Sequence, residues 1–101
     1  MALTRNRRRT QTALNKLAEL VANINGELDA IERLSAAHPQ YRDALDARRR
    51  KLEADRDALY LTLKQFDPEL DPTEIGTLDD WMQTYGRRGA KIAMLRYLRA
   101  L

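Results

Sequence analysis

The chain has 101 residues, of which 18 are Lys or Arg, 15 are Asp or Glu and none is Cys. This length fits one domain, or one domain with an arm, and the absence of Cys excludes disulfides and thiolate metal sites. No apolar run is long enough to span a membrane and no signal-peptide pattern is present, so we expect a cytoplasmic protein.

The charges are sorted along the chain, although the net charge is only +3. Residues 1–10 carry four Arg and no acid, and residues 11–65 carry nine groups of each sign. Residues 66–86 carry six acids and no base, whereas residues 87–101 carry five bases and no acid. Because a polyanion responds to local charge density, the two basic ends are candidates for phosphate contact.

Residues 1–9 predict a flexible basic arm, because no apolar periodicity precedes Leu14. The alternative interpretations of this segment are a frayed first helical turn and a solubilising end. Its candidate phosphate-binding residues are Arg5, Arg7, Arg8 and Arg9.

Residues 10–66 predict an antiparallel helical hairpin that turns at His38-Pro39. In the first arm, apolar residues recur at alternating steps of four and three, the spacing of a seam against a partner helix. These residues are Leu14, Leu17, Val21, Ile24, Leu28 and Ile31. The second arm has Leu45, Leu52 and Leu59 at steps of seven. If paired positions sum to 76, Ile24 meets Leu52 and Ile31 meets Leu45, so the register closes. His38 is the only histidine, and we expect neither a metal-binding nor a catalytic role for it.

Two features of this hairpin depart from a simple seam. Asn25-Gly26 would ordinarily signal a turn, but the heptad phase continues through it. We therefore expect a continuous helix with Gly26 at a tolerated position on its outer face. Arg48 and Asp55 occupy seam positions of the second arm, so they either lie at the seam edge with their heads in water or meet partners in a larger bundle.

The run of cations at residues 48–51 spans every face of one helical turn, and acids surround it. This pattern is typical of a solvated helix with ion pairs along its surface. A two-helix hairpin buries only one seam, so we expect the chain to self-associate, as a dimer, or to dock on something larger.

Residues 67–76 form an acidic junction in which each Asp-Pro predicts a helix N-cap followed by proline at the first helical position. Asp71 with Glu74 three residues later completes a capping-box pattern. Because capping accounts for Asp67 and Asp71 and the spacing is not that of a calcium loop, we expect no metal or catalytic site here.

Residues 77–101 predict a pair of short helices. Thr77 caps the first helix, and Gly86 ends it. The second helix begins at Ala90, and two of its apolar residues lie off the main apolar side, among basic residues. The candidate partner-interface residues of this region are Trp81, Met82, Tyr85, Ile92 and Leu95.

An eight-residue helix, a glycine-containing turn and a basic helix are the parts of a helix-turn-helix. Trp81, Ile92 and Leu95 stand where that motif wants core positions, whereas Met82 and Arg87 depart from it. The candidate nucleic-acid-binding residues are Arg87, Arg88, Lys91, Arg96 and Arg99. The alternative is a helical pair that caps the hairpin, with its cations in solvent or paired with the acids of residues 66–80.

Several of these residues carry a resemblance to a known group of proteins. They are the run Phe66-Asp67-Pro68-Glu69-Leu70-Asp71-Pro72 with Ile75, then Tyr85, Arg88-Gly89 and Leu95 to Leu98-Arg99-Ala100. In this part, residues 50–101, the chain resembles small uncharacterised bacterial proteins of mobile elements that combine a charged coiled coil with a basic helical C-terminus. It departs from them in its acids and Trp81, where the group has an arginine-rich run, and in stopping where the others continue toward a candidate DNA-binding module. The resemblance implies a mobile-element or phage-like setting.

These observations predict an all-α protein, a long antiparallel hairpin followed by two short helices. The leading hypothesis is a non-enzymatic, dimeric, nucleic-acid-associated protein that contacts phosphates through its basic ends. The alternative is a protein-protein adaptor or inhibitor that docks on a host or element-encoded complex through the hairpin and the Trp81 helix. No nucleophile-base pair, phosphate loop or metal cluster can be assembled, so we expect neither an enzyme nor a cofactor.

Overall fold

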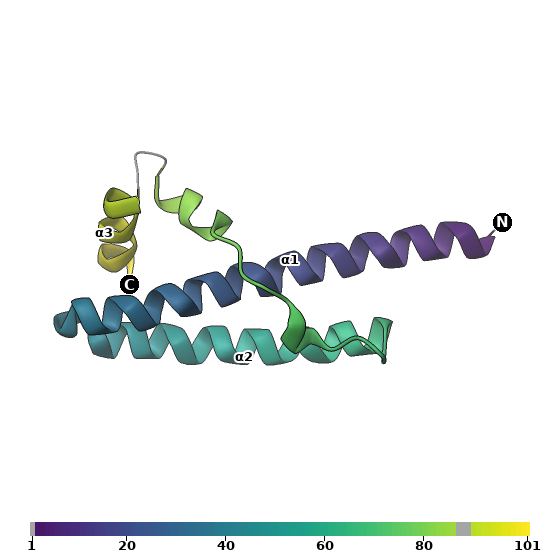
Figure 1. Ribbon diagram of the computed structural model, residues 1–101, viewed down its shortest axis with the longest axis horizontal. Coiled ribbons are helices and arrows are strands. Elements are labelled where there is room, and N and C mark those ends of the chain that lie inside the picture. The colour runs from purple at the N-terminus through teal and green to yellow at the C-terminus, as the bar shows by residue number, and fades with distance from the viewer. Residues whose placement is uncertain (1, 87–89) are drawn as a thin grey trace.

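The computed structural model describes residues 2–86 and 90–101, with side chains described for residues 9–86 and 91–101. Helices α1 (Ala2–Ala37) and α2 (Arg42–Phe66) form an antiparallel hairpin, and helix α3 (Ala90–Ala100) lies against its closed end (Figure 1). Three short 3-10 helices, η1 (Pro39–Tyr41), η2 (Pro72–Glu74) and η3 (Asp80–Tyr85), connect these elements. No strand occurs in the part of the chain that is described, which confirms the predicted all-α class.

The hairpin turns at His38-Pro39, as predicted. The amide of His38 donates to the carbonyl of Leu34 at 2.8 Å, and Pro39 opens η1 because its fixed φ suits a first helical position. The core lies in the closed half of the hairpin, where the predicted seam residues Ile31, Leu45 and Leu52 are buried in one cluster.

α1 begins at Ala2, earlier than the predicted start near residue 10, so the backbone of the predicted flexible arm is helical. The physical reason is local, because no proline or glycine interrupts residues 2–25 and Ala, Leu and Arg are good helix formers. Arg9 is exposed on this helix. The side chains of Arg5, Arg7 and Arg8 lie outside the described residues.

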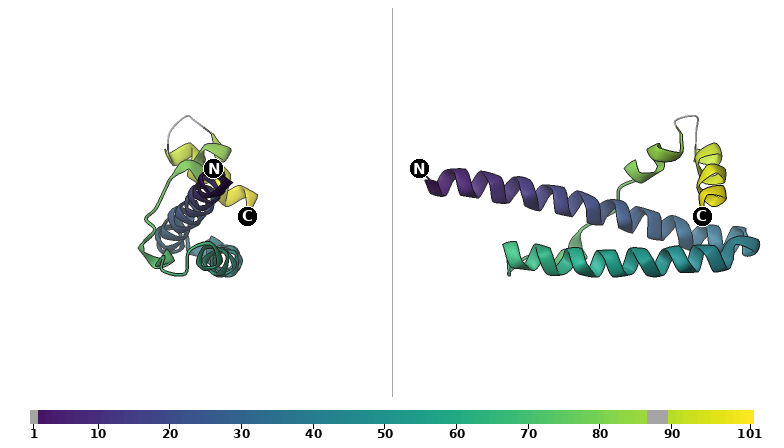
Figure 2. Two further views of the ribbon diagram at one scale, coloured as in Figure 1. Left: turned by 90° about the vertical axis from the view of Figure 1, so that its right-hand side faces the viewer. Right: turned by 180° about the vertical axis from the view of Figure 1, so that it is seen from behind.

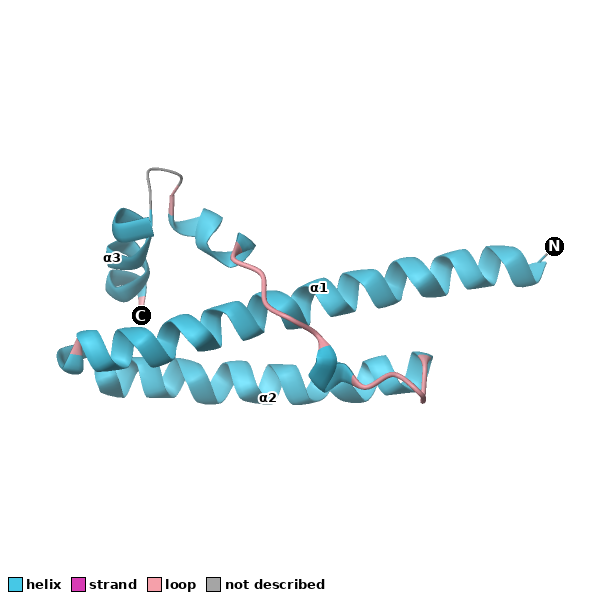
Figure 3. Cartoon of the chain, in the orientation of Figure 1, coloured by secondary structure: helices cyan, strands magenta, loops and turns pink. Residues whose placement is uncertain are grey.

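From the end of α2 the chain returns across α1 as a strap, residues 67–79 (Figure 3). Asp71 caps η2 as predicted, since its Oδ1 accepts from the Thr73 amide at 3.0 Å and from the Thr73 hydroxyl at 2.6 Å. Asp67 accepts from the Glu69 amide at 3.1 Å, but only a single turn follows it. The strap is anchored by Pro72, which is fully buried.

Gly26 is buried beneath the strap, so its predicted place on a tolerated outer surface is wrong. A Cβ on Gly26 would stand 1.9 Å from the carbonyl oxygen of Leu78, which shows that the strap backbone touches the helix here. The amide of Leu78 donates to the carbonyl of Ala22 at 2.9 Å. α1 nevertheless continues through Asn25-Gly26 without a break, as predicted.

The first helix of the predicted C-terminal pair is shorter than expected. Helical structure begins at Asp80 rather than beside Thr77 and has the 3-10 form, and the amide of Leu78 is bonded to α1 instead of lying in a helical turn. The amide of Trp81 is capped by Asn23 Oδ1 of α1 at 3.2 Å, in place of the predicted cap from Thr77. Gly86 ends η3 with φ +127°, a conformation that L side chains rarely adopt.

The end-on view of Figure 2 shows α1 lying between α2 on one side and the pair formed by η3 and α3 on the other. The molecule is elongated, with principal extents of 56 × 27 × 19 Å. α3 therefore rests on the hairpin as a third layer at one end of a long molecule.

Candidate binding surface on α3

α3 is held by its buried face. Ala93, Tyr97 and Leu98 are buried, and the last two join the same core cluster as Ile31 and Leu45. The residues toward the other side of α3 remain exposed, because α1 and η3 cover only one face of it. The position of α3 therefore decides which of its side chains meet solvent.

A buried polar network fixes this position. Glu27 of α1 has only 5% of its surface exposed, and Arg48 of α2 donates to both of its carboxylate oxygens, at 2.6 and 3.1 Å. The Tyr97 hydroxyl of α3 donates to Glu27 Oε2 at 2.6 Å. Burial, followed by the hydrogen bond to the anionic Glu27, raises the pKa of Tyr97 well above its usual value. Hydrogen bonding to Glu27 likewise raises the pKa of Arg48.

This network resolves the polar seam position at Arg48, which pairs with Glu27 of α1 and is linked through Glu27 to Tyr97 of α3. Asp55 instead lies exposed and accepts from Lys51 on its own helix at 3.2 Å. Sequence reasoning did not single out Glu27. The available signal is its spacing, since Glu27 stands seven residues from Leu20 and from Leu34 and so interrupts an apolar stripe of α1.

Trp81, Tyr85 and Tyr97 form an aromatic cluster between η3 and α3. The ring centroids of Trp81 and Tyr85 each lie 5.2 Å from that of Tyr97, in edge-to-face arrangements. Trp81 and Tyr85 are half-buried, as is Met82. These three candidate interface residues are thus partly covered, and the rings of Trp81 and Tyr85 pack inside the chain.

The outer face of α3 carries Lys91, Ile92, Leu95, Arg96 and Arg99, all exposed. Ile92 is 42% and Leu95 is 50% exposed, so neither fills the core position that a helix-turn-helix requires. Among the described residues, no carboxylate pairs with Lys91, Arg96 or Arg99; Arg96 Nη1 donates to the Tyr85 carbonyl at 3.3 Å. Arg87 and Arg88 lie outside the described residues.

The two basic ends of the chain do not form one surface. The N-terminal end of α1 and the outer face of α3 lie toward opposite ends of the molecule (Figure 1). Because the longest extent is 56 Å, far beyond a Debye length of about 8 Å at physiological salt, their fields act separately. α3 is the larger of the two exposed basic sites whose side chains are described.

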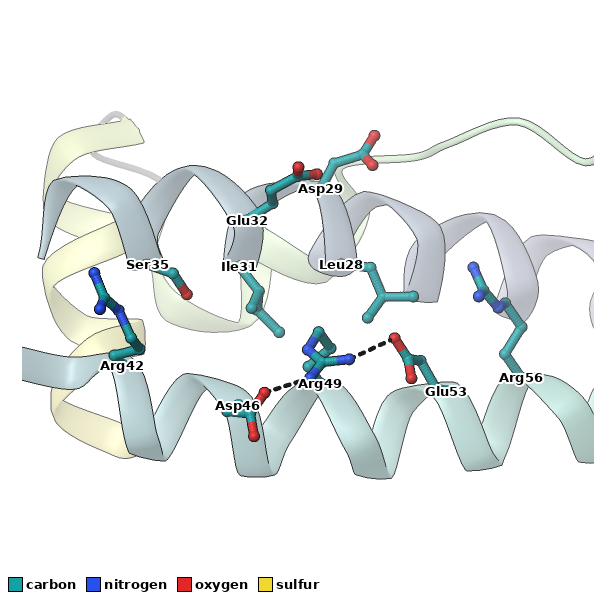
Figure 4. A pocket seen from close by; sticks show the side chains of 10 residues that line it. All are labelled: Leu28, Asp29, Ile31, Glu32, Ser35, Arg42, Asp46, Arg49, Glu53 and Arg56. Carbon is teal, nitrogen blue, oxygen red and sulfur yellow. Dashed lines mark hydrogen bonds and ion pairs between the residues drawn. The ribbon is translucent and has the colours of Figure 1, made fainter. Parts of the chain in front are cut away.

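The cations of residues 48–51 pair with acids of the hairpin, as predicted. Arg49 lies between Asp46 and Glu53 in a groove of about 510 Å³ between α1 and α2 (Figure 4). Arg50 also pairs with Asp46, at 3.1 Å. The hydrogen bond from Arg49 lowers the pKa of Asp46. Four acids and three bases line this groove, so their charges largely cancel.

Among residues 2–86 and 90–101, no group of three or more His, Cys, Asp or Glu side chains could hold a metal ion. None of the described helices is long and apolar enough to cross a membrane. No family model, no curated protein and no solved structure matches the chain.

Proposed function

We propose that the chain is a non-enzymatic helical protein that associates with nucleic acid through the outer face of α3. The observation that supports this function is the set of three exposed cations on α3, Lys91, Arg96 and Arg99, that no described carboxylate neutralises. An exposed row of cations attracts phosphate groups, and contacts with phosphates supply most of the sequence-independent affinity of proteins for nucleic acid. The setting that we propose is the mobile-element one that the resemblance implies.

The test is fluorescence anisotropy with labelled duplex and single-stranded DNA and RNA over a salt series. We expect dissociation constants of about 1–100 µM that weaken steeply with salt, because phosphate contacts release counterions. Neutralising the face in K91Q/R96Q/R99Q should abolish most binding and reduce the slope of log K against log salt by about three.

The matched control is K16Q/R33Q/R42Q, which removes three exposed cations from the hairpin. This variant has the same net charge as K91Q/R96Q/R99Q but keeps the α3 face intact. Equal loss in both variants would show a diffuse charge effect and would contradict a site on α3. Absence of binding by the parent protein at low salt would reject the function.

A second candidate function is that of a protein-protein adaptor, and the exposure of Ile92 and Leu95 favours it. Phosphate contact gains nothing from two aliphatic side chains in water, whereas a protein partner would bury them and gain about 25 cal/mol per Å². Under this alternative, I92A/L95A weakens partner capture and leaves nucleic-acid binding unchanged. Trp81→Ala is a poor test, because Trp81 supports the aromatic cluster.

A further inference from the structure

The acidic and basic segments of this chain are both exposed, yet they do not meet within one molecule. Glu69, Glu74 and Asp79 of the strap are exposed, and no ion pair joins them to the cations of α3 among the described residues. Figures 1 and 2 place α3 at the closed end of the hairpin and η2 toward its open end. Within the described part of a single copy, the acids of the strap therefore do not pair with the cations of α3.

The acidic surface has a groove that suits an apolar ridge. Between α2 and η2 lies a groove of about 380 Å³, bordered by the carboxylates of Asp57 and Asp71 and by the ammonium group of Lys64, with Tyr60 and Leu61 beside them. Leu61 is 68% exposed, which is the largest value among the exposed large hydrophobic residues of the described chain. The two carboxylates of the groove outnumber its one cation, so exposed Leu61 in this acidic setting suits a partner with exposed aliphatic groups between cations.

The outer face of α3 has these properties. Ile92 and Leu95 project between Lys91 and Arg99, so aliphatic and cationic groups alternate on one face. Two α3 helices could not pair with each other in this way, because three cations would face three cations. A second copy of this chain, in contrast, offers the acidic groove.

We propose that the outer face of α3 docks into the groove between α2 and η2 of a second copy. Each copy carries both surfaces, so a two-fold axis makes the contact twice and closes the assembly as a dimer. Ile92 and Leu95 then lie against the exposed side chain of Leu61, and the cations of α3 face the carboxylates of the groove and of the strap. This proposal goes beyond nucleic-acid association and does not depend on it.

The test is sedimentation velocity of the full chain over a range of concentration and salt. The parent protein should be a monomer-dimer mixture that dissociates as salt rises. K91E/R99E, which keeps Arg96 because its guanidinium holds the Tyr85 carbonyl, should weaken dimerisation at least tenfold. E69K/E74K should do the same from the other side of the contact.

An equimolar mixture of K91E/R99E and E69K/E74K decides between a direct contact and general damage. One of the two contacts then joins reversed acids to reversed bases, so heterodimers should form more tightly than either variant forms homodimers. The matched control E19K/E32K changes two exposed acids of α1 by the same charge and should dimerise like the parent. Four outcomes would overturn the proposal. The parent could stay monomeric or assemble without closing, its dimers could be unaffected by either variant, or the mixture of the two variants could fail to associate.

The same variants separate this proposal from nucleic-acid binding. E69K/E74K leaves every cation of α3 in place, so its nucleic-acid affinity should equal or exceed that of the parent. Loss of dimerisation with retained nucleic-acid binding supports the contact. Because the dimer contact covers the outer face of α3, dimerisation of the parent together with no nucleic-acid binding by monomeric E69K/E74K would reject the proposed function alone.

Discussion

Gly26 determines the path of a segment fifty residues away in sequence, because the strap backbone occupies the space where a side chain would stand. In Gly26→Ala the new Cβ would lie 1.9 Å from the carbonyl oxygen of Leu78, so the strap must lift. We expect a loss of about 1–3 kcal/mol in unfolding free energy from overpacking, reduced by about 1 kcal/mol because alanine favours the helix. Urea unfolding followed by circular dichroism measures this.

Gly76→Ala is the control for Gly26→Ala. A Cβ at Gly76 would have no heavy atom within 4 Å, so the same chemical change should leave stability within about 0.5 kcal/mol of the parent. If the two variants were equally stable, the close approach of the strap to α1 would be contradicted.

Because the carboxylate of Glu27 is buried, loss of its ion pair with Arg48 should reduce the unfolding free energy more than loss of a surface ion pair. Arg48→Met keeps the aliphatic stem but leaves a carboxylate that is only 5% exposed with the Tyr97 hydroxyl alone, which should cost about 2–3 kcal/mol. Arg49→Met, which breaks exposed pairs within α2, should change the denaturation midpoint far less. Comparable midpoints for both variants would show that the network contributes no more than a surface pair.

Tyr97 should make stability depend on alkaline pH. Its pKa is raised in the folded protein by burial and by Glu27, so the folded state keeps its proton where the unfolded state loses it. The stability that this proton contributes is therefore complete below about pH 10 and falls as pH rises above the ordinary pKa of tyrosine. Tyr97→Phe should flatten this fall between about pH 10 and 11, measured by urea midpoints, relative to the exposed control Gln40→Ala. An unchanged slope would contradict the assignment to Tyr97.

At the scale of elements, the strap depends on polar side chains of α1 more than on its own secondary structure. Asn25 Nδ2 donates to the carbonyls of Ile75 and Gly76 at 3.2 and 3.1 Å, and its Oδ1 accepts from Arg56 at 2.9 Å. Asn25→Ala should therefore release the strap and speed cleavage after Glu74 by a glutamate-specific protease. Asn15→Ala, which loses only a bond to Gln11, should be cleaved at the parental rate. Equal rates would show that other contacts hold the strap.

The elements differ in how far the sequence predicts them, and the reason is the range of the interactions involved. Three predicted features depend on neighbours in sequence or on one periodic seam, and all three are confirmed. They are the heptad positions around Ile31 and Leu45, the turn at His38-Pro39 and the Asp71 cap. The strap and η3 depend on contacts between residues fifty or more apart, such as Asn25 with Ile75, and no local pattern records these. The prediction that Gly26 lies at a tolerated outer position is wrong for the same reason, because the strap that covers Gly26 comes from residues about fifty positions away.

At the scale of the whole molecule, the sequence indicated which charged residues of α3 are exposed better than how α3 packs. Charge sorting identified the cations of α3, and they are exposed as expected. It could not show that Trp81 and Tyr85 would pack on Tyr97 while Ile92 and Leu95 stay in solvent, because that choice depends on how α3 is rotated by Glu27. The separation of the two basic ends likewise follows from the length of α1. The sequence predicted a flexible arm at residues 1–9 and therefore a shorter helix.

The elongated shape itself is testable by small-angle X-ray scattering. The Cα radius of gyration is 16.2 Å, whereas a compact domain of this size has about 13 Å and an unfolded chain about 30 Å. Measured on E69K/E74K, which should be monomeric, the scattering should give a value near 16–17 Å with hydration included. A value near 13 Å would mean that α1 and α3 fold together and that the basic ends share one surface. A value well above 20 Å in this variant would mean that α3 leaves the hairpin, so that the face it presents is not the one described.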